Sequence, residues 1–331
     1  MRALVLEKPG PAADFPLALV ERPRPAPAAG ELLVRVTACA VCRTDLQIAE
    51  GDLVARRLPI VLGHQAVGSV EAVADGVTGW SVSDRAGVTW LAGFDGTCPR
   101  CLEGRENLCA TAEFTGWDRD GGFAEYLTVR ADVAVALPKG IDDLQAAPLL
   151  CGGVIGFRSL GISGIRDGGR LGLFGFGASA RLAIQVATHR GCRVFVYTRS
   201  EPERTRALAL GAEWAGGYDD APPEPLDAAI TFAPSGDVVI AALRALDRGG
   251  TVAINAIHLD RVPEFSYDAL WWERSLRSVA NLTRRDAAEF VALAAEIPVR
   301  ADIEAHPLAD GNIALQRIAS GAVTGAAVLV P

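Results

Sequence analysis

The stretch RLGLFGFGASARLAIQVATHRGCRVFVYTRS, residues 170–200, decides the fold of this 331-residue chain. Its first part, 170–177, predicts a strand that runs into a glycine turn, and 192–200 predicts a second buried strand. Between them, small and apolar residues recur at helical spacing. They are Ala180, Ala183, Ile184 and Ala187. The order strand, turn, helix, strand is typical of a parallel α/β unit.

The turn at the end of the first strand has the pattern G-x-G-x-x-A. Gly175 permits the tight turn, and Gly177 lets the backbone approach a pyrophosphate. The phosphate would lie at the helix N-terminus, where Ala178 follows, and the small Ala180 allows the helix to pack closely on the strand. A glycine-rich turn without a ligand is the alternative. The surrounding strand–turn–helix–strand order favours dinucleotide binding.

The end of the second strand indicates which dinucleotide binds. Folds that bind NAD usually place Asp or Glu there to bond the adenosine ribose. Here the residues are Thr198, Arg199 and Ser200, and no carboxylate comes before Glu201. Two hydroxyls beside a guanidinium suit a 2′-phosphate, so the sequence favours NADP(H) over NAD(H). A solvated surface arginine is the alternative for Arg199.

The alternation of predicted strands and helices continues beyond residue 200. Strands are predicted at 226–234, 249–257 and 276–282, with a helix at 236–248 between the first two. We therefore expect a doubly wound parallel sheet, a Rossmann domain, over 151–285.

The rest of the chain has a different pattern of predicted strands and helices. Residues 1–150 contain short Val/Leu runs cut by Gly, Pro and Asp, which is typical of antiparallel strands with irregular loops. The tail, 286–331, returns to mixed helix and short strand. We assign these two segments to one β-rich domain that the Rossmann domain interrupts.

Composition excludes several classes of protein. The net charge is −8, and Lys8 and Lys139 are the only lysines. No basic stripe with interleaved aromatic residues is present, so nucleic acid is not an expected partner. The N-terminus has no signal-peptide pattern, and no run of eighteen apolar residues occurs, so we expect a cytoplasmic protein without a membrane span. Seven cysteines in a reducing compartment are better explained by metal ligation than by disulfides.

The sharpest metal signal is DGTCPRCLEGRENLC, residues 95–109. Asp95 precedes Cys98, Cys101 and Cys109, and the three cysteines are spaced so that they can surround one tetrahedral ion. A redox C-x-x-C pair, or thiols without a metal, is the alternative.

Several further motifs complete a full-length resemblance. They are VCRTDL (41–46), GHQAVGSV (63–70), VSDRAGV (82–88), DGGFAEY (120–126) and LLCGG (149–153). With these motifs the chain resembles the zinc-containing medium-chain alcohol dehydrogenases. The resemblance implies a GroES-like catalytic domain beside the Rossmann domain, with the active site between them. In that family the lobe at 95–109 holds a structural zinc with four cysteines, the first of which is Asp95 here; carboxylate oxygen is an acceptable zinc ligand.

The resemblance also implies the catalytic residues. Cys42, His64 and Cys151 match the ligands of the catalytic zinc, which acts as a Lewis acid. Asp45 matches the carboxylate that orients the zinc-bound histidine. Thr44 matches the hydroxyl that bonds the substrate oxygen and passes its proton on. Arg43, next to Cys42, can meet the cofactor phosphates, and a solvated side chain is the equal alternative.

Two residues depart from the family pattern near the chemistry. Gln65 replaces a glutamate behind the zinc, which leaves the positive charge of the metal less compensated. Gln47 replaces a histidine that often ends the proton relay, and glutamine cannot titrate.

The segments that flank the zinc in the family carry Trp90, Phe114 and Trp117 here. They indicate an apolar or aromatic substrate, and a role in the core is the alternative. GRENLC, FGFGASA and VANLTR resemble the bacterial branch that is similar to cinnamyl alcohol dehydrogenases.

These observations predict an enzyme that moves a hydride between a nicotinamide cofactor and a small alcohol or aldehyde. A zinc-free quinone or enone reductase and a non-catalytic protein of the same fold are the alternatives. The set Cys42, His64 and Cys151 argues against the first alternative. Residues 276–282 predict an apolar edge strand that needs cover, so we expect a homodimer or homotetramer.

Overall fold

A computed structural model describes residues 1–257 and 259–331. The chain forms two compact units, Met1–Cys151 with Asn281–Pro331 and Gly152–Ala280. The sequence placed these divisions after residues 150 and 285. The chain passes from the first unit to the second inside one helical run: α3 (Asp143–Pro148), a π-helical turn (Leu149–Gly153) and α4 (Val154–Ser163).

The run at 143–163 is long and apolar enough to cross a membrane by length and composition, which the sequence analysis did not anticipate. Of the most apolar 18-residue window of this run, a share of 61% is buried inside the protein. Core helices pass the same test, so the run is weak evidence for a membrane span.

The second unit is built on a six-stranded sheet in which every pair of neighbours is parallel. The order β13-β12-β11-β14-β15-β16 is the doubly wound Rossmann arrangement. The strands are β11 (Arg170–Phe174), β12 (Arg193–Tyr197), β13 (Trp214–Gly216), β14 (Leu226–Thr231), β15 (Leu246–Ile254) and β16 (Ser275–Ser278). Besides α4, its helices are α5 (Ala178–His189), α6 (Glu201–Ala209) and α7 (Gly236–Ala245), with a 3₁₀ turn at Tyr267–Ala269.

The core of this unit explains why these segments become strands. The central strands are apolar on both faces, as expected when helices cover both sides of a parallel sheet. Phe174 and Tyr197, on neighbouring strands, stack with ring centroids 4.0 Å apart. The sheet is thereby fixed at the strand ends that lead into the glycine turn.

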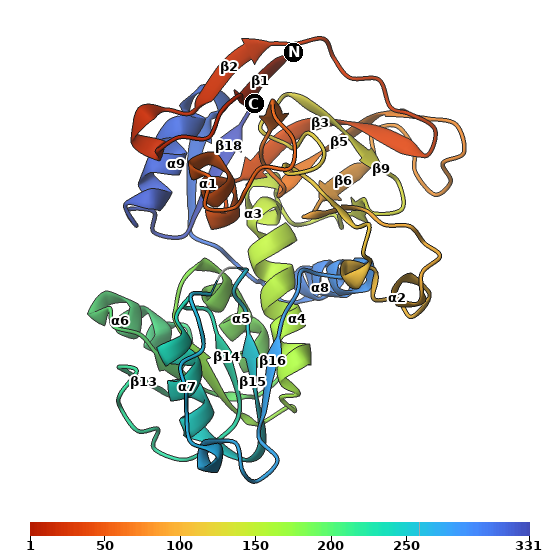
Figure 1. Cartoon of the computed structure of the whole chain (residues 1–331). Helices are drawn as coiled ribbons and strands as arrows, with labels where there is room; N and C mark the ends of the chain where they lie inside the picture. Colours follow the sequence, from red (N-terminus) through yellow and green to blue (C-terminus); the bar gives the residue numbers. More distant parts are fainter. Residues whose placement is uncertain (258) are drawn as a thin grey trace. The chain divides into compact units, whose positions relative to one another are not determined.

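The first unit contains three sheets and brings the two ends of the chain together (Figure 1). The largest has the order β10-β6-β5-β3-β18-β17, and β9 also pairs with β3. A three-stranded sheet has the order β2-β1-β4, and β7 pairs with β8. The C-terminal strand β18 lies antiparallel to β3, so the tail completes a sheet that the N-terminal half begins.

Most strands of the first unit are short, as the cut Val/Leu runs predict, and the two long ones are β3 and β5. The strands are β1 (Arg2–Leu6), β2 (Leu17–Glu21), β3 (Glu31–Ala40), β4 (Ile60–Val61), β5 (Ala66–Val73), β6 (Arg85–Val88), β7 (Leu91–Gly93), β8 (Glu113–Phe114), β9 (Tyr126–Arg130), β10 (Val135–Ala136), β17 (Ile303–Pro307) and β18 (Ala326–Val330). Besides α3, the helices are α1 (Arg43–Glu50), α2 (Pro99–Leu102), α8 (Arg284–Glu296) and α9 (Gly311–Ala319), with 3₁₀ turns at Ala12–Asp14, Glu106–Leu108 and Leu308–Asp310.

Candidate active site, metal centres and cofactor site

Three residues from distant parts of the first unit converge on one point. Cys42 precedes α1, His64 lies between β4 and β5, and Cys151 lies in the π-helical turn after α3. One ligand atom from each lies within 4.8 Å of the other two. His64 is buried, whereas the two cysteines are partly exposed. Two thiols and an imidazole form a donor set that suits zinc with one open position.

The Asp45 carboxylate holds the parts of this cluster together through hydrogen bonds. It is fully buried and accepts hydrogen bonds from the Cys42 backbone N–H at 2.8 Å and the Gly63 backbone N–H at 3.1 Å. His64 Nδ1 lies 3.1 Å from the same carboxylate. Donation from Nδ1 leaves Nε2 to face a metal ion, which is the usual arrangement of a carboxylate behind a zinc-bound histidine.

The charges of the metal-free cluster are set by these contacts. A hydrogen bond from the Cys151 thiol holds the pKa of Cys42 well below its usual range, and the same bond raises the pKa of Cys151. Burial opposes the charged form of His64, but Asp45 and Cys42 together raise its pKa to about 10. Without a metal, these shifts favour the thiolate of Cys42 and the protonated forms of Cys151 and His64.

The residues around α1 lie as follows. Thr44 Oγ1 is 3.8 Å from Cys42 Sγ, which places the hydroxyl beside the candidate metal ligand. Arg43 is exposed. Gln65 is buried and donates weakly to the Ala40 carbonyl at 3.5 Å. The buried Oε1 of Gln47 has no hydrogen-bond partner among the described residues.

An aromatic cluster lies directly against the histidine. The Trp90 ring meets His64 edge-on with centroids 4.6 Å apart. Trp90 also stacks with Phe114 at 5.4 Å and with Trp117 at 5.8 Å. The three aromatic residues that the sequence placed near the zinc are thus one continuous apolar surface that begins at a candidate ligand. Trp90 is buried, and Phe114 and Trp117 are partly exposed.

The second candidate metal site lies in the loop that contains α2. One ligand atom from each of Asp95, Cys98, Cys101 and Cys109 lies within 4.8 Å of the others. Asp95 uses its two oxygens differently: Oδ1 accepts from the backbone N–H groups of Thr97 and Cys98 at 2.8 Å each, and Oδ2 lies 3.2 Å from Cys109 Sγ. Those backbone bonds hold the pKa of Asp95 well below its usual range. An ionised oxygen therefore stands where a fourth thiolate would.

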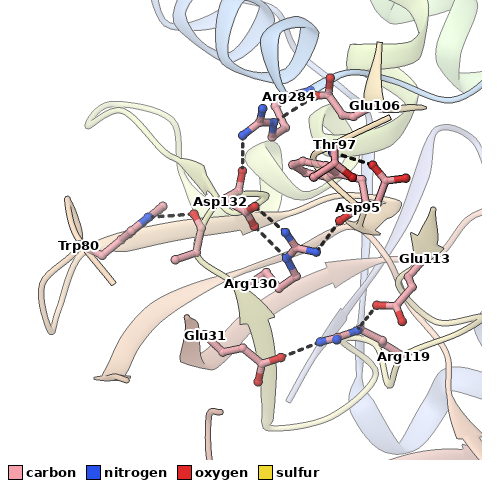
Figure 2. A network of polar contacts seen from close by, with 12 residues as sticks. Glu31, Trp80, Asp95, Thr97, Glu106, Glu113, Arg119, Arg130, Asp132 and Arg284 are labelled. Atoms are coloured by element: carbon pink, nitrogen blue, oxygen red, sulfur yellow. Dashed lines mark hydrogen bonds and ion pairs between the residues drawn. The ribbon is translucent and has the colours of Figure 1, made fainter. Parts of the chain in front are cut away.

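A network of arginines ties this loop to its surroundings, as Figure 2 shows. Arg130 donates to the Phe94 carbonyl at 3.0 Å, and Arg284 pairs with the buried Glu106 at 3.1 Å. Both guanidinium groups also lie within 5 Å of the centroid of the Phe94 ring. The loop is thus fixed to β9 and to the first residue of α8.

In the second unit, the glycine turn has the geometry that a pyrophosphate requires. Gly175 has φ +94°, and a Cβ there would lie 2.8 Å from the Ala233 backbone N. A Cβ on Gly177 would meet nothing within 4 Å, so this side of the turn is open. α5 begins at Ala178, and Ala180 is fully buried. These features fit a dinucleotide phosphate at the N-terminus of α5.

The end of β12 presents the predicted hydroxyl and guanidinium groups. Thr198 is buried, whereas Arg199 and Ser200 are exposed. The nearby acids are engaged elsewhere, since Glu201 pairs with Arg204 and Glu203 with Arg181.

Sequence reasoning missed two polar residues at the carboxyl ends of strands in this sheet. Thr231 ends β14, and Asn255 follows β15 directly. Thr231 Oγ1 and Asn255 Nδ2 are buried and have no hydrogen-bond partner among the described residues. Buried polar groups are normally bonded, so these two fit a ligand at the carboxyl ends of the strands. A polar residue at the end of an apolar strand was the available signal.

Comparisons with known proteins agree with this assembly. Residues 28–139 match the family described as alcohol dehydrogenase GroES-like domain. A relative from Mycobacterium tuberculosis, named "Probable alcohol dehydrogenase AdhA", is 46% identical over 336 residues, covering 100% of this chain and 97% of its own.

Two solved structures have the same fold. The cobalt- and zinc-bound thermostable alcohol dehydrogenase from Pyrobaculum aerophilum has a TM-score of 0.89 at 27% identity, covering 100% of this chain and 99% of that one. A cinnamyl alcohol dehydrogenase from Sorghum bicolor has a TM-score of 0.90 at 24% identity, covering 99% and 97%. The predicted fold, a GroES-like domain with a Rossmann domain, is confirmed. The chain belongs to the zinc-containing medium-chain alcohol dehydrogenase family, whose members are oxidoreductases acting on CH–OH groups.

Proposed function

We propose that this protein is a zinc-dependent alcohol dehydrogenase and aldehyde reductase that acts on apolar or aromatic substrates with a nicotinamide cofactor. The observation that carries the proposal is the convergence of Cys42, His64 and Cys151, with Asp45 bonded to the far nitrogen of the histidine. A zinc-free reductase on this fold would need no such donor set. A non-catalytic protein would need neither the donor set nor an open glycine turn.

Each residue of the site has a separate task. Zinc, when bound by Cys42, His64 and Cys151, supplies a Lewis acid for the substrate oxygen. The Thr44 hydroxyl, beside Cys42, bonds that oxygen and receives or returns its proton. The aromatic face of Trp90, Phe114 and Trp117 contacts the apolar part of the substrate.

In this chain the proton path beyond Thr44 leads to Gln47, where the family often has a histidine. Gln47 can hydrogen-bond a water molecule through its amide, but it cannot hold the proton. Aldehyde reduction, in which water supplies the proton, is therefore favoured at neutral pH, and alcohol oxidation gains as the pH rises.

We also propose that the loop at 95–109 holds a structural zinc through Asp95, Cys98, Cys101 and Cys109. The two roles of the Asp95 oxygens support this ligand set, because Oδ1 shapes the loop while Oδ2 faces the thiols. One carboxylate in place of a thiolate makes the site weaker than one with four cysteines.

The preferred cofactor in this proposal is NADP(H). Thr198, Arg199 and Ser200 offer donors for a 2′-phosphate, and Arg43 offers a further cation for the phosphates. The Arg199 guanidinium makes no hydrogen bond or ion pair with the described residues. Glu201 and Glu203 pair with Arg204 and Arg181, so the nearby carboxylates already face arginines.

The protein is proposed to work in the cytoplasm as a homodimer or homotetramer. β16 is an edge strand of the six-stranded sheet, and its last two residues are exposed. Large aromatic residues, Tyr267, Trp271 and Trp272, are exposed in the segment just before it. An uncovered edge beside exposed aromatic residues supports pairing with a second copy.

The first test is zinc content, measured by mass spectrometry of the purified chain. We expect about two zinc ions per chain, because two donor sets of the right kind are present. Cys42→Ala should lose one ion and nearly all turnover, and Cys98→Ala should lose the other ion and lower stability. Cys192→Ala, outside both sets, should keep both ions. Full activity in a zinc-free preparation, or a zinc content that Cys98→Ala leaves unchanged, would contradict the two assignments.

The second test is proton release on zinc binding at pH 7. The raised pKa values of His64 (about 10) and Cys151 favour the protonated forms of both in the metal-free site, whereas the lowered pKa of Cys42 favours its thiolate. Zinc binding should therefore release about two protons, and zinc affinity should fall as the pH is lowered. Calorimetry of Cys98→Ala in buffers of different ionisation enthalpy measures this release at the catalytic site alone. A binding enthalpy independent of the buffer would refute the charge assignment.

The third test concerns cofactor choice. Arg199→Ala should lower kcat/KM for NADPH about tenfold or more, because a charge-assisted bond to the 2′-phosphate is lost. The value for NADH should change little. Arg244→Ala removes an exposed arginine from α7 and serves as the control. If the wild type uses NADH as well as NADPH, Arg199 is a surface residue and the preference is wrong.

A further inference from the structure

The aromatic surface beside His64 ends at an arginine that sequence reasoning did not single out. Arg56 lies in the loop between α1 and β4. Its guanidinium carbon lies 3.8 Å from the centroid of the Trp117 ring and 5.3 Å from that of Phe114. Both rings contact Trp90, which contacts His64. A continuous series of contacts therefore leads from a candidate zinc ligand to a cation.

The loop that carries Arg56 is held against this surface. The Trp117 indole N–H donates to the Val54 carbonyl at 2.8 Å, two residues before the arginine. The guanidinium is also ion-paired, since Nη1 lies 3.1 Å from one Asp118 oxygen and 3.4 Å from the other. Arg56 therefore has a defined place beside the rings although 45% of its side chain is exposed.

The pairing with Asp118 leaves half of the guanidinium available. Nε and Nη2 of Arg56 make no hydrogen bond with the described residues. The Asp118 oxygen nearer to Arg56 also accepts the Phe114 backbone N–H at 2.8 Å, so the carboxylate is turned toward the Nη1 side. A guanidinium that lies on an aromatic face directs its N–H groups outward in its own plane, where a carboxylate can accept two of them.

The charges around the loop favour an anion. Arg57, next in sequence, lies 3.7 Å from Asp120, which also pairs with Arg22 at 3.3 Å. With Arg56 and Asp118, three arginines thus share two carboxylates.

We propose that Arg56 determines substrate specificity, and that the preferred substrate is an aromatic aldehyde or alcohol with a carboxylate at the end opposite the reacting carbon. The proposal rests on the proposed function: the reacting oxygen lies at Cys42, His64 and Cys151, the ring lies along Trp90 and Trp117, and the carboxylate accepts from Nε and Nη2 of Arg56. Arg56 would then select among aromatic substrates without contacting the reacting atoms.

The test compares matched aldehydes with the zinc-loaded enzyme. 4-Carboxybenzaldehyde and 4-carboxycinnamaldehyde cover two lengths, and the corresponding carboxamides are neutral controls of nearly the same shape. We expect the wild type to prefer the better-fitting acid over its amide by about tenfold in kcat/KM. Arg56→Met keeps an apolar stem over the rings and removes the donors, so this preference should vanish while the rate with the amide stays within about twofold. Arg57→Met should keep the preference.

A binding measurement separates this proposal from the proposed function. Calorimetry with 4-carboxybenzyl alcohol and its amide requires no turnover, and the acid should bind more tightly to the wild type but not to Arg56→Met. Turnover of both aldehydes without any preference, or a preference that Arg56→Met retains, overturns the role of Arg56 and leaves the proposed function intact. Selective binding without turnover of any aldehyde supports Arg56 and contradicts the proposed function.

Discussion

The candidate zinc-binding cluster of Cys42, His64 and Cys151 depends on one buried carboxylate that accepts three hydrogen bonds. Asp45 accepts from the Cys42 backbone, the Gly63 backbone and His64 Nδ1. A buried carboxylate is costly unless it is bonded, and here each bond also fixes a part of the site. The first fixes the start of α1 at a zinc-ligand candidate, the second fixes the turn before His64, and the third orients the imidazole. Asp45 can do this because it is the third residue of α1, where its side chain reaches back to the N-cap.

Close backbone packing supports the same turn from the other side. The segment at 121–123 bonds to 61–63 through three backbone hydrogen bonds of 2.7–2.9 Å. A Cβ on Gly121 would lie 2.1 Å from the Gly63 carbonyl oxygen, so only glycine permits this approach. Gly63 itself has φ +95°, with the Phe123 ring against it. The motifs GHQAVGSV (63–70) and DGGFAEY (120–126) thus both need glycine for their close backbone packing, and this packing holds His64 in place.

The sequence predicted those parts of the molecule whose signals are local. The glycine turn at 175–177 lies between its strand and helix as expected, and Cys98, Cys101 and Cys109 surround one point with Asp95. Cys42, His64 and Cys151 are distant in sequence, so only the family resemblance could bring them together. The first division between the units lies after Cys151, one residue beyond the predicted one, and the helical run from α3 through α4 crosses it without a break. The sequence did not reveal a role for Arg56, because the role depends on its contact with Trp117. That residue is distant in sequence and is brought close only by the fold.

The most direct test of the central role of Asp45 is the zinc affinity of Asp45→Asn, measured by competition with a chelator. An amide offers one acceptor oxygen to three donors, and its NH₂ group faces a donor, so at least one of the three bonds is lost. Removing such a partner of a zinc-bound histidine typically lowers metal affinity roughly 10–100-fold. We predict a loss of that size at the catalytic site, with zinc in the 95–109 loop retained. Asp52→Asn, an exposed acid just after α1, should change neither site. Unchanged affinity in a folded Asp45→Asn protein would show that the carboxylate does not organise the site.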